Sequence, residues 1–293
     1  MTTYDYEERA ELSTAALTTK EKLLVVARNN KLATVGAGML VLALLGAFIL
    51  PLLYGVDPLT TNSDATLQPP SAEHPFGTDT FGRDILARVI HAAQLDFFIA
   101  ISVTVLALAI GACIGAIAGY ARGLVDDVVM RFVDLMLSFP AFILALAITV
   151  MLGNEIRYVI AAIAFAYIPH FVRLTRGEVL KIRDSEYADA ARVVGNPAWR
   201  VAFRHVFPNA VAPALVFASI VLGWAILDAS ALGFLGIGIK PPAPEWGTMV
   251  AEGSDEIFSG SWWTWLFPGL AILAVVLAFN WLGDGLRNLL RHA

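Results

Sequence analysis

Six apolar runs constrain the fold of this 293-residue chain more than any other feature of its sequence. A helix needs roughly 20 apolar residues, at about 1.5 Å per residue, to cross the ~30 Å hydrocarbon core of a bilayer. We place the runs at Ala33–Leu53, Phe97–Tyr120, Val128–Leu152, Tyr158–Val172, Ala210–Gly236 and Trp265–Leu282. The fourth run is the shortest. Because 58% of the residues are apolar and only 15% are charged, the sequence predicts an all-α membrane protein.

Lysine and arginine are distributed unequally between the two sides that these runs define. Of the 20 Lys and Arg residues, only Arg83, Arg88, Arg157 and Lys240 fall in the connections on one side. Positive residues accumulate on the cytoplasmic side of membrane proteins. We therefore expect both termini and the loop 173–209 to be cytoplasmic.

The runs also divide the chain into regions. We expect a cytoplasmic N-terminal tail at 1–32, a first membrane helix at 33–53, an external loop at 54–96 and a core at 97–293. The core contains the other five membrane helices and the cytoplasmic loop 173–209. The first run begins about thirty residues into the chain and lacks a small-residue cleavage site, so we expect an anchor rather than a signal peptide.

The cytoplasmic loop has the pattern of a helix, a sharp turn and a second helix. Asp184 or Ser185 is placed to cap the first helix, and Glu186 and Asp189 lie in its early turns, where the helix dipole favours negative charge. Gly195 is predicted to stop this helix, because glycine adopts the left-handed conformation at low cost.

The second helix of the loop is predicted to begin after a cap at Asn196, with Pro197 in its first position. Trp199, Phe203 and Val206 recur at helical spacing, while Arg200 and Arg204 lie one turn apart on another face. This pattern is typical of a helix at the lipid headgroups. By composition alone, the loop remains equally consistent with a simple amphipathic connector.

The spacing within the loop resembles a known signature. Asp189-Ala190-Ala191, three residues, Gly195, nine residues and then His205-Val206-Phe207-Pro208 resemble the E-A-A, three, G, nine, I-x-L-P loop of permease subunits in ABC-type importers. Aspartate replaces the glutamate, and His205 and Phe207 depart from the usual letters. The resemblance implies a six-helix transmembrane bundle of the type I ABC importer fold, in which a cytoplasmic coupling helix contacts an ATPase. It assigns ATPase coupling to Glu186, Asp189, Ala190, Ala191, Gly195 and Pro208.

Two external stretches resemble a narrower group. His74-Pro75-Phe76-Gly77-Thr78-Asp79 with Gly82-Arg83-Asp84, and Leu232–Gly236 with Pro241-Pro242 and Glu245-Trp246-Gly247, are similar to loops of the C-type permease in oligopeptide, dipeptide and nickel importers. This resemblance implies a passage for peptides, with nickel, glutathione, opines or oligosaccharides as alternative solutes. The external segment Lys240–Ser261 is placed to approach a binding protein, although a solvated or re-entrant loop is an equal alternative.

The resemblance also implies partners and a location. The partners are a homologous second permease, two ABC ATPases that bind ATP and Mg²⁺, an extracytoplasmic solute-binding protein, and membrane lipid. The location is the cell (inner) membrane of a bacterium or archaeon. The net charge of −5 gives no reason to expect a nucleic-acid partner.

Several kinds of chemistry have no motif in this sequence. It contains no G-x-x-x-x-G-K-S/T phosphate loop, so we expect no ATPase activity, no bound cofactor and no enzyme function from this chain. His170 has no second ligand near it in sequence, and the single cysteine, Cys113, has no partner, so no metal site or disulfide is expected. A secondary transporter or channel is a distant alternative, because buried carboxylates that suggest a proton relay are too few.

Candidate pathway and packing residues lie within the apolar runs. Asp228 is predicted either to line a pathway or stabilise a hinge, or to reach external water from a helix end. Pro140 is expected to interrupt the third span and Pro169 to end the fourth, and such breaks suit a gate as well as an inert bundle.

Gly111, Gly115 and Gly119 repeat every fourth residue of the second run. This spacing favours close helix packing, with a moving gate interface as the alternative. We also expect an ion pair between Arg131 and Asp134, and an interfacial aromatic belt at Trp262, Trp263 and Trp265.

Overall fold

The computed structural model describes residues 30–291 and, among them, side chains through Arg287. The predicted tail therefore lies almost entirely outside the described residues. Within them the chain is helical, and its only extended pairing is an isolated bridge between Thr78 and Asp84. The elements are α3 (Lys31–Tyr54), the 3-10 turn η1 (Ser63–Ala65), α4 (Ile85–Ala121), α5 (Gly123–Leu137), α6 (Ala141–Leu152), α7 (Ile156–Ile182), α8 (Glu186–Val193), α9 (Ala198–Arg200), a π-helical turn (Val201–Val206), α10 (Phe207–Ala210), α11 (Ala212–Phe234), α12 (Trp246–Ser254) and α13 (Trp263–Arg291).

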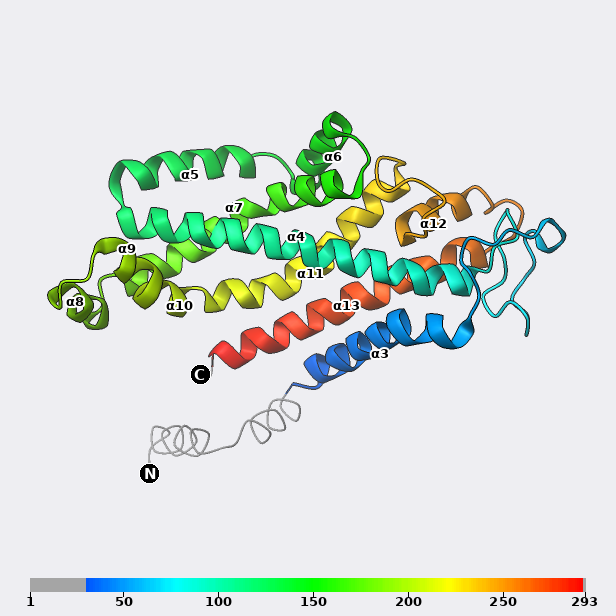
Figure 1. Cartoon of the computed structure of the whole chain (residues 1–293), viewed down its shortest axis with the longest axis horizontal. Coiled ribbons are helices and arrows are strands. Elements are labelled where there is room, and N and C mark those ends of the chain that lie inside the picture. Colours follow the sequence, from blue (N-terminus) through cyan, green and yellow to red (C-terminus); the bar gives the residue numbers. More distant parts are fainter. Residues whose placement is uncertain (1–29, 292–293) are drawn as a thin grey trace, which may run out of the picture.

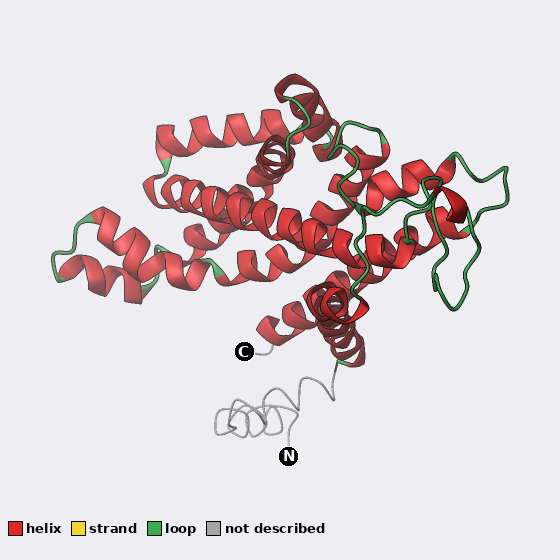
Figure 2. Ribbon diagram, turned by 45° about the vertical axis from the view of Figure 1, so that its right-hand side comes forward, coloured by secondary structure: helices red, strands yellow, loops and turns green. Residues whose placement is uncertain are grey.

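The long helices run alongside one another in an elongated bundle (Figure 1). Helix α4 packs along α7 and α11, and α13 packs against both α3 and α11. The short helices α8, α9 and α10 lie at one end of the bundle, together with the end of α13. The long loop after α3 and helix α12 lie at the opposite end (Figure 1), where Figure 2 shows the long loops in green. Each end of the bundle therefore carries a distinct set of short elements.

Five helices are long and apolar enough to cross a membrane, namely α3, α4, α7, α11 and α13. The predicted third span is different, because α5 and α6 meet at an angle of 88°. Pro140 stands directly before α6 and follows the end of α5 at Leu137. The expected kink is therefore a full break, and the bundle has six spans only if the bent pair counts as one.

Helix α4 is longer than the apolar pattern predicted. Its 37 residues give it a length of about 55 Å. It begins at Ile85, with the Asp84 carboxylate accepting a 2.8 Å hydrogen bond from the Ala87 amide. Residues 85–96, which we expected in the external loop, are therefore helical. The polar residues Arg88 and Asp96 kept this part of the helix out of the apolar run.

Helix α7 also extends beyond its predicted end. Pro169 was expected to end the fourth span, but it lies inside α7, which continues to Ile182. The first ten residues of the predicted loop 173–209 are consequently helical. Since α7 forms a continuous rod, it joins the bundle directly to the short helices at its end.

Candidate functional site

The loop after α7 contains the predicted helix and its glycine stop. Helix α8 ends at Val193, and Gly195 follows with a φ of +86°, a conformation that favours glycine. Ser185 occupies the cap position, but its hydroxyl donates to the Ile182 carbonyl at 2.7 Å instead of accepting from α8. Glu186 and Asp189 remain in the first turn, where their charge favours the helix N-terminus.

The second helix of the loop differs from its prediction. Asn196 is not its cap, because the side-chain amide donates to the Ala191 carbonyl at 2.9 Å and so closes the end of α8. Pro197 precedes the helix, which begins at Ala198 and continues through the π-helical turn into α10. The expected helix is therefore a chain of short segments leading to α11.

A small apolar core holds this loop to the bundle. It consists of Ala116, Val179, Ala188, Ala191, Val201, Val206 and Ala210. These residues come from α4, α7, α8, the π-helical turn and α10. Ala188 and Val201 are completely buried. This core joins α8 to α4, to α7 and to α10, which leads into α11.

Hydrogen bonds and ion pairs attach the same loop to the turn between α4 and α5. Arg192 pairs with Asp189 and donates to the Arg183 carbonyl, and Arg183 in turn donates to the Tyr120 carbonyl. Asp184 pairs with Arg122, whose hydrogen bond holds the pKa of that carboxyl below its ordinary value. Arg122 has a positive φ of 55°, which is uncommon for a residue with a side chain.

The outer surface of the loop is apolar where it turns. Val193 and Val194 are 86% and 81% exposed, and Trp199 is 63% exposed. Glu186, Asp189, Ala190 and Gly195 are also exposed, whereas Ala191 is buried in the loop core. The predicted coupling residues thus lie together on α8 and its turn, except for Pro208 at the other end of the loop. The sequence reading missed the valine pair, although two adjacent β-branched residues in a polar loop are a usable signal.

The three glycines of α4 face α7 at close range. A Cβ at Gly115 would lie 2.5 Å from the Val172 carbonyl oxygen, and one at Gly119 would lie 2.9 Å from the Arg176 carbonyl oxygen. A Cβ at Gly111 would meet the same helix at Ile168 and Phe171. Such distances are too short for any side chain at these positions unless a helix moves. These glycines let α4 and α7 approach closely.

Asp228 is bonded to a neighbouring helix within the bundle. Its carboxylate accepts a 2.7 Å hydrogen bond from the Tyr167 hydroxyl of α7. The Tyr167 ring lies beside Trp224 of α11, with ring centres 6.1 Å apart. Of the three candidate gate residues, Asp228 therefore links α7 to α11, Pro169 is buried within α7, and Pro140 lies at the break before α6.

Two further contacts differ from the sequence reading. Asp134 pairs with Arg173 of α7 at 2.6 Å and not with Arg131 of its own helix. Of the predicted aromatic belt, Trp262 is 47% exposed and Trp265 is partly exposed, but Trp263 is only 8% exposed and its indole N–H donates to the Thr78 carbonyl at 3.1 Å. Both bonds join segments that are far apart in sequence.

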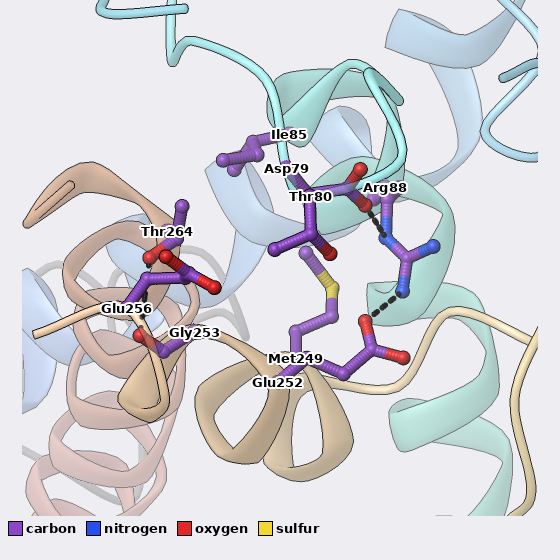
Figure 3. Close-up of a pocket in the computed structure, with 9 residues that line it drawn as sticks. All are labelled: Asp79, Thr80, Ile85, Arg88, Met249, Glu252, Gly253, Glu256 and Thr264. Carbon is purple, nitrogen blue, oxygen red and sulfur yellow. Dashed lines mark hydrogen bonds and ion pairs between the residues drawn. The ribbon is translucent and has the colours of Figure 1, made fainter. Parts of the chain in front are cut away.

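The external signature segments converge into one structure. Arg88 of α4 lies between Asp79 of the first segment and Glu252 of α12, with a 3.0 Å bond to Glu252 (Figure 3). Arg83 forms ion pairs with the same two carboxylates, at 2.6 Å to Asp79 and 3.0 Å to Glu252. Charges buried to this extent need an oppositely charged partner, and these four groups supply one another with partners. We call this assembly of residues 74–88 and α12 the external cap, after the side on which the distribution of Lys and Arg predicts it.

The second signature segment places α12 against α4 and α11. Glu245 caps α12 by accepting from the Gly247 and Thr248 amides at 2.7 and 2.8 Å. The Trp246 amide donates to Asp96 at 3.2 Å. A Cβ at Gly247 would lie 1.9 Å from the Ser230 carbonyl oxygen, so only glycine fits at this position. Burial raises the pKa of the Glu245 carboxyl, although its hydrogen bonds oppose the shift.

Two family models match this chain. One, described as the binding-protein-dependent transport system inner membrane component, matches residues 111–292. The other, described as the N-terminal TM domain of oligopeptide transport permease C, matches residues 27–70. The first model covers both the loop with α8 and the second external signature segment.

Several relatives are similar over most of their length. The dipeptide transport system permease protein DppC of Alkalihalophilus pseudofirmus is 43% identical over 263 residues, which are 90% of this chain and 86% of the relative. DppC of Escherichia coli K12 is 44% identical over 269 residues, which are 90% of this chain and 89% of that relative. The probable D,D-dipeptide transport system permease protein DdpC of the same strain is 39% identical over 92% of this chain and 90% of its own. The chain belongs to the family of binding-protein-dependent transport system inner membrane components, the permeases of type I ABC importers.

Proposed function

We propose that this protein is one of two permease subunits in an ATP-driven importer of dipeptides and oligopeptides. The observation that carries the proposal is the loop after α7, whose exposed turn at Val193 and Val194 is connected through a buried core to α4, α7 and α11. The named relatives are permeases of dipeptide transport systems, which supports peptides as the solute.

In this mechanism α8 is the coupling helix. A partner ATPase binds the exposed turn, and its closure on ATP and Mg²⁺ displaces α8. The loop core transmits the displacement because Ala188 and Ala191 pack directly against Val201 and Val206. The hydrogen-bonded pair Tyr167 and Asp228, which joins α7 to α11, lies on the route between the loop and the external end. The solute pathway then alternates between inward and outward access.

The assembly contains four further subunits on this proposal. A homologous second permease completes the pathway, two ATPases hydrolyse ATP, and an extracytoplasmic binding protein delivers peptide to the external cap. Helices α5 and α6 expose large apolar side chains, such as Leu124 at 79% and Met151 at 85%. These side chains provide a surface that lipid and the second permease would cover. The termini and α8 face the cytoplasm of a bacterial or archaeal cell.

Reconstitution tests the proposed function directly. Proteoliposomes with this chain alone, and proteoliposomes with the second permease and both ATPases, are supplied with ATP on the ATPase side and with a peptide-loaded binding protein on the other. We expect labelled dipeptide to accumulate only in the complete system. Accumulation by this chain alone would instead support a secondary transporter, and import of nickel without peptide would replace the proposed solute.

A further inference from the structure

The segment between the exposed turn at Val193 and Val194 and helix α11 has a basic outward face. Residues 197–210 contain Arg200, Arg204 and His205 but no carboxylate. Val201, Ala202, Val206 and Ala210 form the inward face and are buried. On the outward side, a groove is lined by Trp199, Arg200, Phe203, Arg204 and Pro208. We call it the basic groove.

The two arginines of this groove have no acidic partner within residues 30–291. Five other arginines of the same half of the bundle do, since Arg122, Arg173, Arg176, Arg183 and Arg192 each pair with an aspartate, whereas Arg131 and Arg287 have no acidic partner among the described residues. Arg200 instead lies over the Trp199 ring, 5.4 Å from its centre. Both Arg200 and Arg204 are exposed. Two uncompensated guanidinium groups, one turn apart, create a site for a negatively charged group.

The chemistry of the groove matches a phosphate bound to an apolar body. Guanidinium groups bind phosphate through paired N–H donors and are weakly hydrated. Trp199 and Phe203 supply amphipathic and apolar surface beside them, a combination that is typical of the membrane interface. Free phosphate would use only the arginines, whereas a lipid would use both kinds of side chain.

The groove begins beside the exposed turn, at Trp199, and extends from there toward α11. Helices α9 and α10 lie between α8 and the start of α11 (Figure 1), so the groove is closer to the spans than the exposed valines are. Helix α11 begins at Ala212, only four residues after Pro208, and it is a candidate membrane span. The groove is therefore carried by the segment that leads directly into a candidate membrane span.

We propose that the basic groove binds the headgroup of an anionic phospholipid. Arg200 and Arg204 hold the phosphate, while Trp199 and Phe203 contact the glycerol and the upper acyl chain. Since the same segment packs on Ala188 and Ala191 through Val201 and Val206, the bound lipid anchors the base of the coupling loop at the membrane surface. This binding is independent of which solute is carried.

Native mass spectrometry of the delipidated full chain in a neutral detergent tests this site. The chain is titrated with phosphatidylglycerol and, separately, with phosphatidylcholine. We expect tighter binding of phosphatidylglycerol, weakened about 5-fold by R200Q or R204Q and about 25-fold by both together. R157Q is the matched control, because Arg157 is also exposed but lies at the start of α7, next to Glu155. It should leave phosphatidylglycerol binding unchanged.

Further measurements identify the ligand and separate a loss of binding from misfolding. Inorganic phosphate at millimolar concentration should not displace the lipid, and displacement would indicate a free-anion site instead. The thermal unfolding midpoint of the double variant should equal that of the wild type, which keeps a binding loss separate from misfolding. Equal binding of both lipids, or unchanged lipid binding combined with lost ATPase association, would overturn the proposal and assign the groove to a protein partner.

Discussion

At the scale of single residues, glycines and buried acids define what the sequence can tolerate. Gly38 and Gly115 illustrate the difference, since both lie in long apolar helices. A Cβ added at Gly38 meets no atom within 4 Å, whereas one at Gly115 meets the backbone of α7 at 2.5 Å. The same residue type therefore serves close packing at one position and makes no close contact at the other.

Gly115→Ala is expected to destabilise the protein by about 1 to 3 kcal/mol, because the new methyl group overpacks α4 against α7. Gly38→Ala is the control and should be neutral or slightly stabilising, since alanine favours helices more than glycine does. Thermal unfolding in detergent, followed by circular dichroism, measures both. Equal midpoints for the two variants would show that the approach of α4 to α7 is not tight.

Glu245 should make stability depend on pH. Burial raises the pKa of its carboxyl above the ordinary value of 4.5, so the folded state favours the protonated carboxyl. The contribution of this group to the free energy of unfolding is therefore fully present below pH 4.5 and is lost as the pH rises through the folded-state pKa. Glu245→Gln keeps an oxygen to cap α12 but removes the titration. As the pH rises above 4.5, the unfolding midpoint of the variant should fall less than that of the wild type. Parallel pH profiles would contradict this assignment.

At the scale of elements, apolar periodicity predicted where the spans lie but not where their helices end. The start of α4 was missed because Arg88 and Asp96 are polar, and their partners Glu252 and Trp246 come from α12, more than a hundred residues later. The helix α8 was predictable because its acidic first turn and Gly195 act locally. The break before α6 was predictable at Pro140, but its 88° angle was not, because proline fixes no direction for the following helix.

The exposed turn after α8 is expected to bind the ATPase through its two valines. Val193→Asp or Val194→Asp should weaken association with the ATPase roughly 10-fold or more, because a central apolar contact is lost. The unfolding midpoint should stay unchanged, since both side chains are more than four-fifths exposed. Co-purification and titration with the ATPase measure the effect.

Val56→Asp serves as the control for these variants, since Val56 is exposed just after α3, at the end of the bundle opposite α8. It should not alter ATPase association. Wild-type association in the Val193 and Val194 variants would exclude this turn from the interface.

At the scale of the whole molecule, the two ends of the bundle carry different contacts. One end holds the loop after α7, with α8 and the basic groove, and the other holds the external cap with its four-charge cluster of Asp79, Arg83, Arg88 and Glu252. The membrane class and the opposite placement of these ends followed from hydropathy and positive charge. The packing of residues 74–88 against α12 could not be predicted in this way, because it depends on contacts between residues distant in sequence.

Cysteine labelling is expected to confirm which end faces the cytoplasm. In a Cys113→Ala background no native cysteine remains, because Cys113 is the only one. Phe258→Cys, at a fully exposed position, should react with a membrane-impermeant maleimide in intact cells, and Val194→Cys only after permeabilisation. The reverse pattern would invert the topology and place α8 outside.

The central claim is that α8 and its turn transmit the action of the ATPase to the bundle. Peptide uptake per ATP hydrolysed, measured in proteoliposomes containing the complete importer, tests it most directly. Gly195→Val forces a β-branched residue into a φ of +86°, whereas Gly195→Asn is tolerated there, and neither side chain begins in contact with another atom. We expect a loss of roughly 10-fold or more in uptake per ATP for Gly195→Val and near wild-type coupling for Gly195→Asn. Equal uptake per ATP in the wild type and both variants would contradict it.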